Sequence, residues 1–110
     1  MILRAKLRMG QLPEPVDCSL AYPLYAWLLS HISSEAGNRL HEQGVRPIHQ
    51  YLSYNPKTKE CWWMVYLLND ETVGLFAPIL ENAMEARLHS GVIGFASCEL
   101  EQIDTPYTFI

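Results

Sequence analysis

Two residues near the middle of the chain, His41 and Arg46, have side chains that could cut a phosphodiester bond without a metal ion. Imidazole titrates near neutral pH, so His41 could take a proton from a ribose 2′-hydroxyl or give one to the leaving 5′-oxygen. A guanidinium stays charged and can stabilise the charge that builds on the phosphate in the transition state. The same spacing also fits a histidine that complements a helix dipole, followed by an exposed arginine. Spacing alone favours this second, structural interpretation.

Other familiar catalytic and cofactor-binding signatures, such as GxGxxG, the P-loop, HExxH and GxSxG, are absent from the sequence. Histidines occur at four positions that do not form paired metal-ligand spacings: His31, His41, His49 and His89. The three cysteines form no CxxC pair, and an odd number favours neither a disulfide framework nor a zinc site. We therefore expect reduced thiols, no metal and no cofactor.

The chain has 110 residues, of which 49% are hydrophobic and 18% charged, and this composition suits one globular domain. The net charge is −4, but the charges are unevenly distributed. Residues 1–69 hold seven basic and five acidic side chains, whereas residues 70–110 hold one basic and seven acidic side chains. Any surface that faces RNA should therefore lie in the first two-thirds. No apolar run is long enough for a signal peptide or a membrane span, so we expect a cytoplasmic protein without membrane contact.

Residues 2–9 alternate between apolar and basic side chains, which predicts a half-buried strand. The apolar side chains are expected on one face: Leu3, Ala5, Leu7 and Met9. The basic side chains are expected on the other: Arg4, Lys6 and Arg8. Residues 11–15 then read as a loop because they hold two prolines.

A helix is predicted from Pro23, since apolar residues follow at steps of three and four as far as Ala36. Asn38 could cap a short second helix over residues 39–42, which would place His41 near a helix end. Gly44 and Pro47 end helical structure.

Residues 48–54 and 61–68 predict two strands of a hairpin, because the segment between them is polar and turn-like. The second strand is apolar on both faces, as a central strand would be, and its Trp62 and Trp63 are expected to be core residues. Asp70 is expected to cap a second long helix, which Ser90 and Gly91 end. Residues 92–103 supply a final strand, or a pair of strands broken near Gly94.

This order predicts an α+β fold over residues 1–104, with the ferredoxin-like βαββαβ arrangement of four antiparallel strands and two helices on one face. If the apolar side of the first strand faces the helices, Arg4, Lys6 and Arg8 lie on the open face of the sheet.

Two stretches, YPLYAWLL at residues 22–29 and LHEQGVRPI at residues 40–48, resemble the first helix and following loop of the CRISPR repeat-processing endoribonucleases. The resemblance covers residues 3–103, and its most specific element is Leu-His-Glu followed by glycine and a basic residue. It implies that His41 is the general acid or base and that Arg46 is its basic partner. Many members carry a tyrosine where this chain has Leu29, so Tyr25 and His31 are the candidates for a third catalytic role.

The resemblance implies metal-independent cleavage of precursor CRISPR RNA, a step of antiviral defence, leaving a 2′,3′-cyclic phosphate and a 5′-hydroxyl. The expected RNA-binding residues are Arg4, Lys6, Arg8 and Arg39. Family members carry two such domains, so residues 105–110 are expected to be a tail or the start of a linker to a second ferredoxin-like domain. Besides repeat RNA, the expected partners are other CRISPR effector subunits, or a second copy bound through the open sheet face. The alternative is a non-catalytic ferredoxin-like module that binds a protein or ribonucleoprotein, because the fold hosts many activities.

Overall fold

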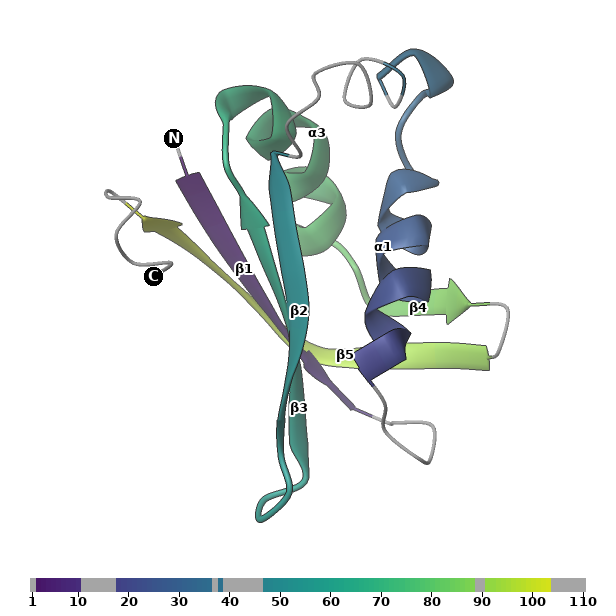
Figure 1. The fold of residues 1–110 in the computed structure, drawn as a ribbon, viewed down its shortest axis with the longest axis vertical. Helices are drawn as coiled ribbons and strands as arrows, with labels where there is room; N and C mark the ends of the chain where they lie inside the picture. The colour runs from purple at the N-terminus through teal and green to yellow at the C-terminus, as the bar shows by residue number, and fades with distance from the viewer. Residues whose placement is uncertain (1, 11–17, 37, 39–46, 89–90, 104–110) are drawn as a thin grey trace.

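The computed structural model describes residues 2–10, 18–36, 38, 47–88 and 91–103. In this part of the chain, helices cover one face of a five-stranded antiparallel sheet (Figure 1). The elements are β1 (Ile2–Met9), η1 (Cys18–Leu20), α1 (Ala21–Leu29), β2 (Ile48–Asn55), β3 (Glu60–Leu67), α3 (Asp70–Glu81), β4 (Glu85–Leu88) and β5 (Gly91–Ile103). The strands lie in the order β2-β3-β1-β5-β4. The α+β class is confirmed, but the prediction of four strands is wrong because β4 adds a fifth.

β1 lies in the middle of the sheet, between β3 and β5, and alternates as its sequence predicts. Ala5 and Leu7 are fully buried on the helix side. The basic side chains that alternate with them project to the opposite face, where they meet residues of β5 and β3. β1 therefore connects the hydrophobic core to the open face of the sheet.

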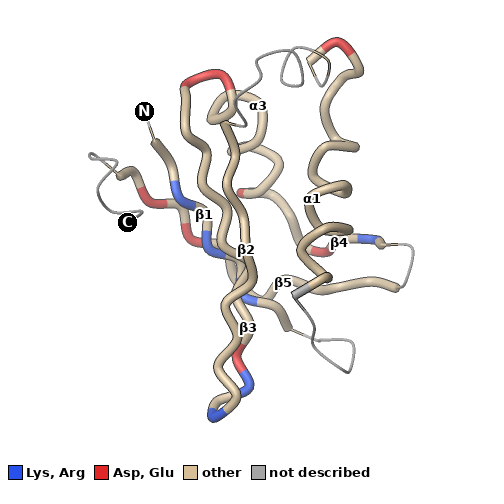
Figure 2. Tube along the Cα trace, in the orientation of Figure 1, with Lys and Arg blue, Asp and Glu red and all other residues tan. Residues whose placement is uncertain are grey.

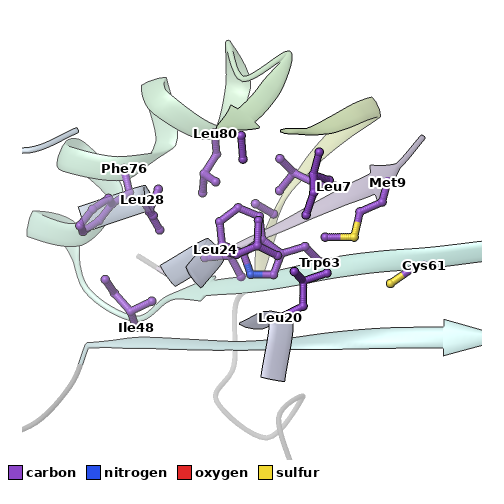
Figure 3. Close-up of a cluster of buried hydrophobic side chains, with 14 of the residues drawn as sticks. Leu7, Met9, Leu20, Leu24, Leu28, Ile48, Cys61, Trp63, Phe76 and Leu80 are labelled. Atoms are coloured by element: carbon purple, nitrogen blue, oxygen red, sulfur yellow. The ribbon is translucent and has the colours of Figure 1, made fainter. Parts of the chain in front are cut away.

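The core lies between the sheet and the two helices α1 and α3 (Figure 3). Each helix contributes two fully buried apolar side chains, and they are Leu24 and Leu28 of α1 and Phe76 and Leu80 of α3. All four pack against the same face of the sheet, in one cluster with Trp63. The prediction that both helices cover one face is confirmed by this packing.

The two adjacent tryptophans of β3 point to opposite faces, because side chains alternate along a strand. Trp63 is fully buried, and its Nε1–H donates to Oε1 of Gln50 on β2 at 2.9 Å. Its ring stacks on Phe95 and meets Trp27 edge-on, at centroid distances of 6.0 and 6.2 Å. Trp62 is half-buried on the open face. The expectation of a core tryptophan pair is therefore correct for Trp63 only.

α1 begins before Pro23 and ends at Leu29, so the prediction of one helix as far as Ala36 is wrong. The hydroxyl of Ser30 donates to a carbonyl of the last turn, and the next two backbone N–H groups bond to carbonyls three residues earlier. Such bonds tighten and close a helix. Oγ of Ser33 then accepts the N–H of Ala36 at 3.1 Å, so residues 34–36 start a separate helical turn.

The cap of α3 is Asn69, one residue before the predicted Asp70. Oδ1 of Asn69 accepts the N–H of Thr72 at 2.9 Å, and Oγ1 of Thr72 accepts the N–H of Asn69 at 3.3 Å. The two residues thus satisfy each other's backbone donors in a capping box. Pro78 lies inside the helix without ending it.

α3 ends at Glu81, so the predicted continuation to residue 89 is wrong. The N–H and the Nδ2 group of Asn82 both donate to the carbonyl of Pro78, which closes the last turn. β4 follows and pairs with the start of β5, where Ala86 and Ile93 lie buried opposite each other. Met84, which the predicted helix would have included, follows the end of α3 and is exposed.

Three expected features fall outside the described residues: the loop at 11–15, the short helix at 39–42 and the tail from 105. Among the helices that the structure describes, none has the length and apolar character needed to cross a membrane.

Candidate nucleic-acid interface

The residues expected to carry catalysis are only partly described. His41, Arg46 and the expected RNA contact Arg39 lie in residues 39–46, outside the described part of the chain. Tyr25 is half-buried on α1 and packs against the core between helices and sheet. His31 is exposed in the turn after α1, with its ring 4.6 Å from that of Trp27 in an edge contact. The two candidates for the third catalytic role therefore differ in exposure and lie more than one helical turn apart.

The three basic residues of β1 lie on the open face, as the alternation predicts. Arg4 sits between Tyr66 of β3 and Glu101 of β5 in the strand register. Lys6 sits in the next row, between Met64 and Glu99. Each basic side chain of β1 thus has a neighbour on both sides, and these neighbours decide how much charge it presents.

Each of these three cations forms an ion pair with a glutamate. The guanidinium of Arg4 donates to Glu101, and Nζ of Lys6 lies 3.9 Å from Oε2 of Glu99. Nη2 of Arg8 donates to Oε1 of Glu60 at 3.1 Å. Figure 2 shows this arrangement as basic positions along β1 beside acidic positions on β5. The basic strand is therefore balanced by acidic neighbours that the charge distribution along the sequence does not reveal.

A cluster of three aromatic rings lies on the same face, on β2 and β3. His49 and Tyr51 are neighbours on one side of β2, with ring centroids 5.7 Å apart, and both are exposed. Tyr66 of β3 lies 5.9 Å from the His49 ring and stacks on the Tyr51 ring at 6.1 Å. The hydroxyls of Tyr51 and Tyr66 are 3.4 Å apart. We call these three residues the aromatic cluster.

The aromatic cluster is linked to the basic strand through Tyr66. Hydrogen bonds to Glu101 and to Tyr66 raise the pKa of the Arg4 guanidinium above its ordinary value. The hydrogen bond with Tyr66, together with burial, raises the pKa of the Tyr51 hydroxyl. Both groups therefore keep their protonated forms across the physiological range. Lys6 contacts an aromatic ring outside this cluster, since its Nζ lies 5.1 Å from the centre of the Trp62 ring in a cation–π contact.

The sequence gives a signal for part of this cluster. Alternation along residues 48–54 predicts that His49 and Tyr51 share a face opposite Ile48, and the burial of Ile48 confirms that they lie on the open side. The partner Tyr66 depends on the pairing register of β2 with β3, which alternation within one strand cannot give.

The described residues contain no group of three or more histidine, cysteine or acidic side chains arranged to hold a metal ion. What the open face offers chemically is cations, aromatic rings and carboxylates. No protein-family model and no curated protein sequence matches this chain.

Proposed function

We propose that this chain is an RNA-processing endoribonuclease of the CRISPR repeat-cleaving type, or the N-terminal half of one. The observation that carries the proposal is the strand order β2-β3-β1-β5 with α1 and α3 on one face. This is the order of a ferredoxin-like βαββαβ domain, with β4 as an added arm of the last strand. It is the domain type of the family that residues 22–29 and 40–48 resemble.

In the proposed reaction the 2′-oxygen attacks the neighbouring phosphorus while the bond from phosphorus to the 5′-oxygen breaks. His41 accepts the proton of the 2′-hydroxyl or gives a proton to the 5′-oxygen. Arg46 holds the phosphate and stabilises the charge that builds on it. Tyr25 or His31 would supply the third group. The products are a 2′,3′-cyclic phosphate and a 5′-hydroxyl, so no electron acceptor or donor is needed.

The RNA surface in this proposal includes Arg39 and the basic side chains of β1. A phosphate that approaches β1 must compete with the glutamates that pair with it, since all three β1 cations already have an anionic partner. Affinity should therefore depend on salt, but with a smaller slope than three unpaired cations would give.

The ion pairs on the open face also favour a second candidate function, a non-catalytic module in a protein or ribonucleoprotein assembly. A ferredoxin-like fold alone does not choose between the two functions, and the nuclease is preferred because residues 40–48 also resemble the repeat-processing family. They differ in one consequence, because only the first requires His41 for a chemical step.

Incubation of the protein with an end-labelled CRISPR repeat RNA in EDTA tests the proposal. We expect a single cut with a cyclic phosphate on the upstream product, abolished in His41→Ala and weakened in Arg46→Ala. Arg87→Ala is the matched control for the arginine variant, because Arg87 is an exposed arginine of β4 that pairs with Glu85 two residues away. Absence of cleavage together with stable protein partners in pull-downs would favour the second candidate.

A further inference from the structure

The exposed part of the aromatic cluster offers a flat ring surface at the edge of the sheet. Tyr51 is 39% exposed, whereas Tyr66, its diagonal neighbour on β3, is only 6% exposed. The two rings are nearly parallel, at 21°, and their hydroxyls lie 3.4 Å apart. His49 adds a second exposed ring on the same strand, two residues away. The contact with Tyr66 thus positions the Tyr51 ring, while part of that ring remains exposed to solvent.

Cations lie within one nucleotide's reach of this ring surface. Tyr51 pairs with Met64, and Met64 pairs with Lys6 on the next strand. Neighbouring strands are about 4.8 Å apart, so the backbones of Tyr51 and Lys6 are separated by roughly 10 Å. A base stacked on Tyr51 could therefore extend its phosphate over β1. Arg4 lies near the same ring surface, because it is opposite Tyr66 in the register of β1 against β3.

A second ring can become available when Lys6 moves. Nζ of Lys6 now lies over the Trp62 ring. Trp62 pairs with Ser53, so Trp62 and Tyr51 are diagonal neighbours about 7–8 Å apart. If Lys6 turned to a phosphate, the Trp62 ring would be free for a base next to the one on Tyr51. Stacking of successive bases on neighbouring rings is how single strands are held without base-specific contacts.

The open face suits RNA better than a second protein sheet. Its apolar residues Met64, Tyr66 and Ile103 are already buried, so a docked sheet would remove little further apolar surface from water. Such a sheet would also enclose the ion pairs of β1, and burying paired charges costs more than their attraction returns unless every group is satisfied. Bound RNA would instead replace the glutamate partner of a β1 cation with a phosphate, and the surface would remain in contact with water.

We infer that the open face is a stacking site for unpaired RNA bases, with Tyr51 and His49 as the first ring surface and Trp62 as the second. This inference rests on the proposed function, because it assumes that the substrate is RNA. Glu99 and Glu101 compete with RNA phosphate for Lys6 and Arg4 and thereby limit the affinity.

Fluorescence anisotropy of the full chain with a labelled, unstructured 12-nucleotide RNA tests the inference. Tyr51→Ala should raise the dissociation constant by about 5- to 150-fold, the loss that removal of one stacking ring gives. Tyr51→Leu keeps apolar bulk on the strand and should show a similar loss, while Tyr51→Phe should bind within a few-fold of the original. Tyr22→Ala is the matched control, since Tyr22 is 79% exposed on α1, on the helix side of the sheet.

Glu99→Gln and Glu101→Gln should bind the same RNA more tightly than the original chain. Equal affinity of Tyr51→Ala, Tyr51→Leu and Tyr22→Ala would overturn the inference. A self-association of the chain that Tyr51→Ala abolishes, without RNA binding, would also overturn it in favour of a second copy.

The outcomes separate this inference from the proposed function. RNA that is cut in a His41-dependent way but binds Tyr51→Leu normally would refute the stacking site alone. RNA that binds through Tyr51 but is never cut would refute the nuclease and support the stacking site.

Discussion

The hydrogen bond between Gln50 and Trp63 ties the edge strand β2 to the centre of the core, and its removal should weaken the fold. Trp63 is fully buried, so Gln50→Ala would leave its indole N–H enclosed without its acceptor at 2.9 Å. An unsatisfied buried donor costs about 1–3 kcal/mol. Gln50 itself is half-buried, so water can reach part of the vacated space and the lower part of this range applies. We expect the free energy of unfolding to fall by about 1–2 kcal/mol.

A double-mutant cycle isolates this hydrogen bond from other effects of shortening Gln50. Trp63→Phe removes the donor, so in that background Gln50→Ala should cost less than about 0.5 kcal/mol, giving a coupling of about 1 kcal/mol. Urea unfolding, monitored by far-ultraviolet circular dichroism, measures the free energy of unfolding of the four proteins. The dependence of this free energy on urea concentration should be the same for all four. If Gln50→Ala costs the same with and without the indole, the bond does not stabilise the fold as we argue.

Two further predictions concern the helix cap and the cysteine of β5. Asn69→Ala removes the side-chain acceptor for the N–H of Thr72 and should lower the free energy of unfolding by about 0.5–2 kcal/mol in the same urea assay, and no change would refute the capping role. Burial, with smaller contributions from Glu81 and a second glutamate, raises the pKa of the Cys98 thiol, so the folded chain holds that proton more tightly than the unfolded chain. The free energy of unfolding should therefore fall as the pH rises through the range in which thiols titrate. In a Cys18→Ser background, the rate at which Cys98 reacts with Ellman's reagent should reach half its maximum at a higher pH than that of free cysteine. Glu81→Gln should lower that midpoint, and a midpoint at or below that of free cysteine would contradict the account.

Local sequence patterns predict the parts of the fold that depend on local rules. The alternation of residues 2–9 gives β1 and assigns Arg4 to the open face, because β1 is covered on one side only. The turn-like residues 55–60 give the β2–β3 hairpin, and Ile48 lies on the predicted face. These features follow from side-chain periodicity and turn chemistry alone.

β4 could not be predicted in this way, because its formation depends on a tertiary contact. The apolar spacing of Phe76, Leu80 and Ala83 continues a helical face past the true end of α3. Asn82 stops the helix, and the pairing of Ala86 with Ile93 then favours a strand. β4 is stabilised by apolar side chains that it buries together with β5. The sequence pattern of one segment on its own does not reveal this contribution.

In the candidate interface, too, local patterns predict some features, while others depend on how the strands pair. The face occupied by Arg4 and Lys6 follows from alternation, but their ion pairs do not, since the partners Glu101 and Glu99 are set by the register of β1 against β5. The contact of Tyr51 with Tyr66 likewise depends on the register of β2 against β3. Sequence periodicity thus predicts which side chains share the open face, and pairing register determines which of them touch.

The single-turnover rate of repeat-RNA cleavage in EDTA, at saturating protein, tests the central claim most directly. A positioned general acid or base contributes about 10²- to 10⁴-fold, so His41→Ala should slow the cut by that factor while RNA affinity stays unchanged. Arg87→Ala, which removes an exposed arginine of β4 that has no assigned role in cleavage, should cleave at the original rate. An unchanged rate in His41→Ala would contradict the assignment of the catalytic residue and with it the proposed function.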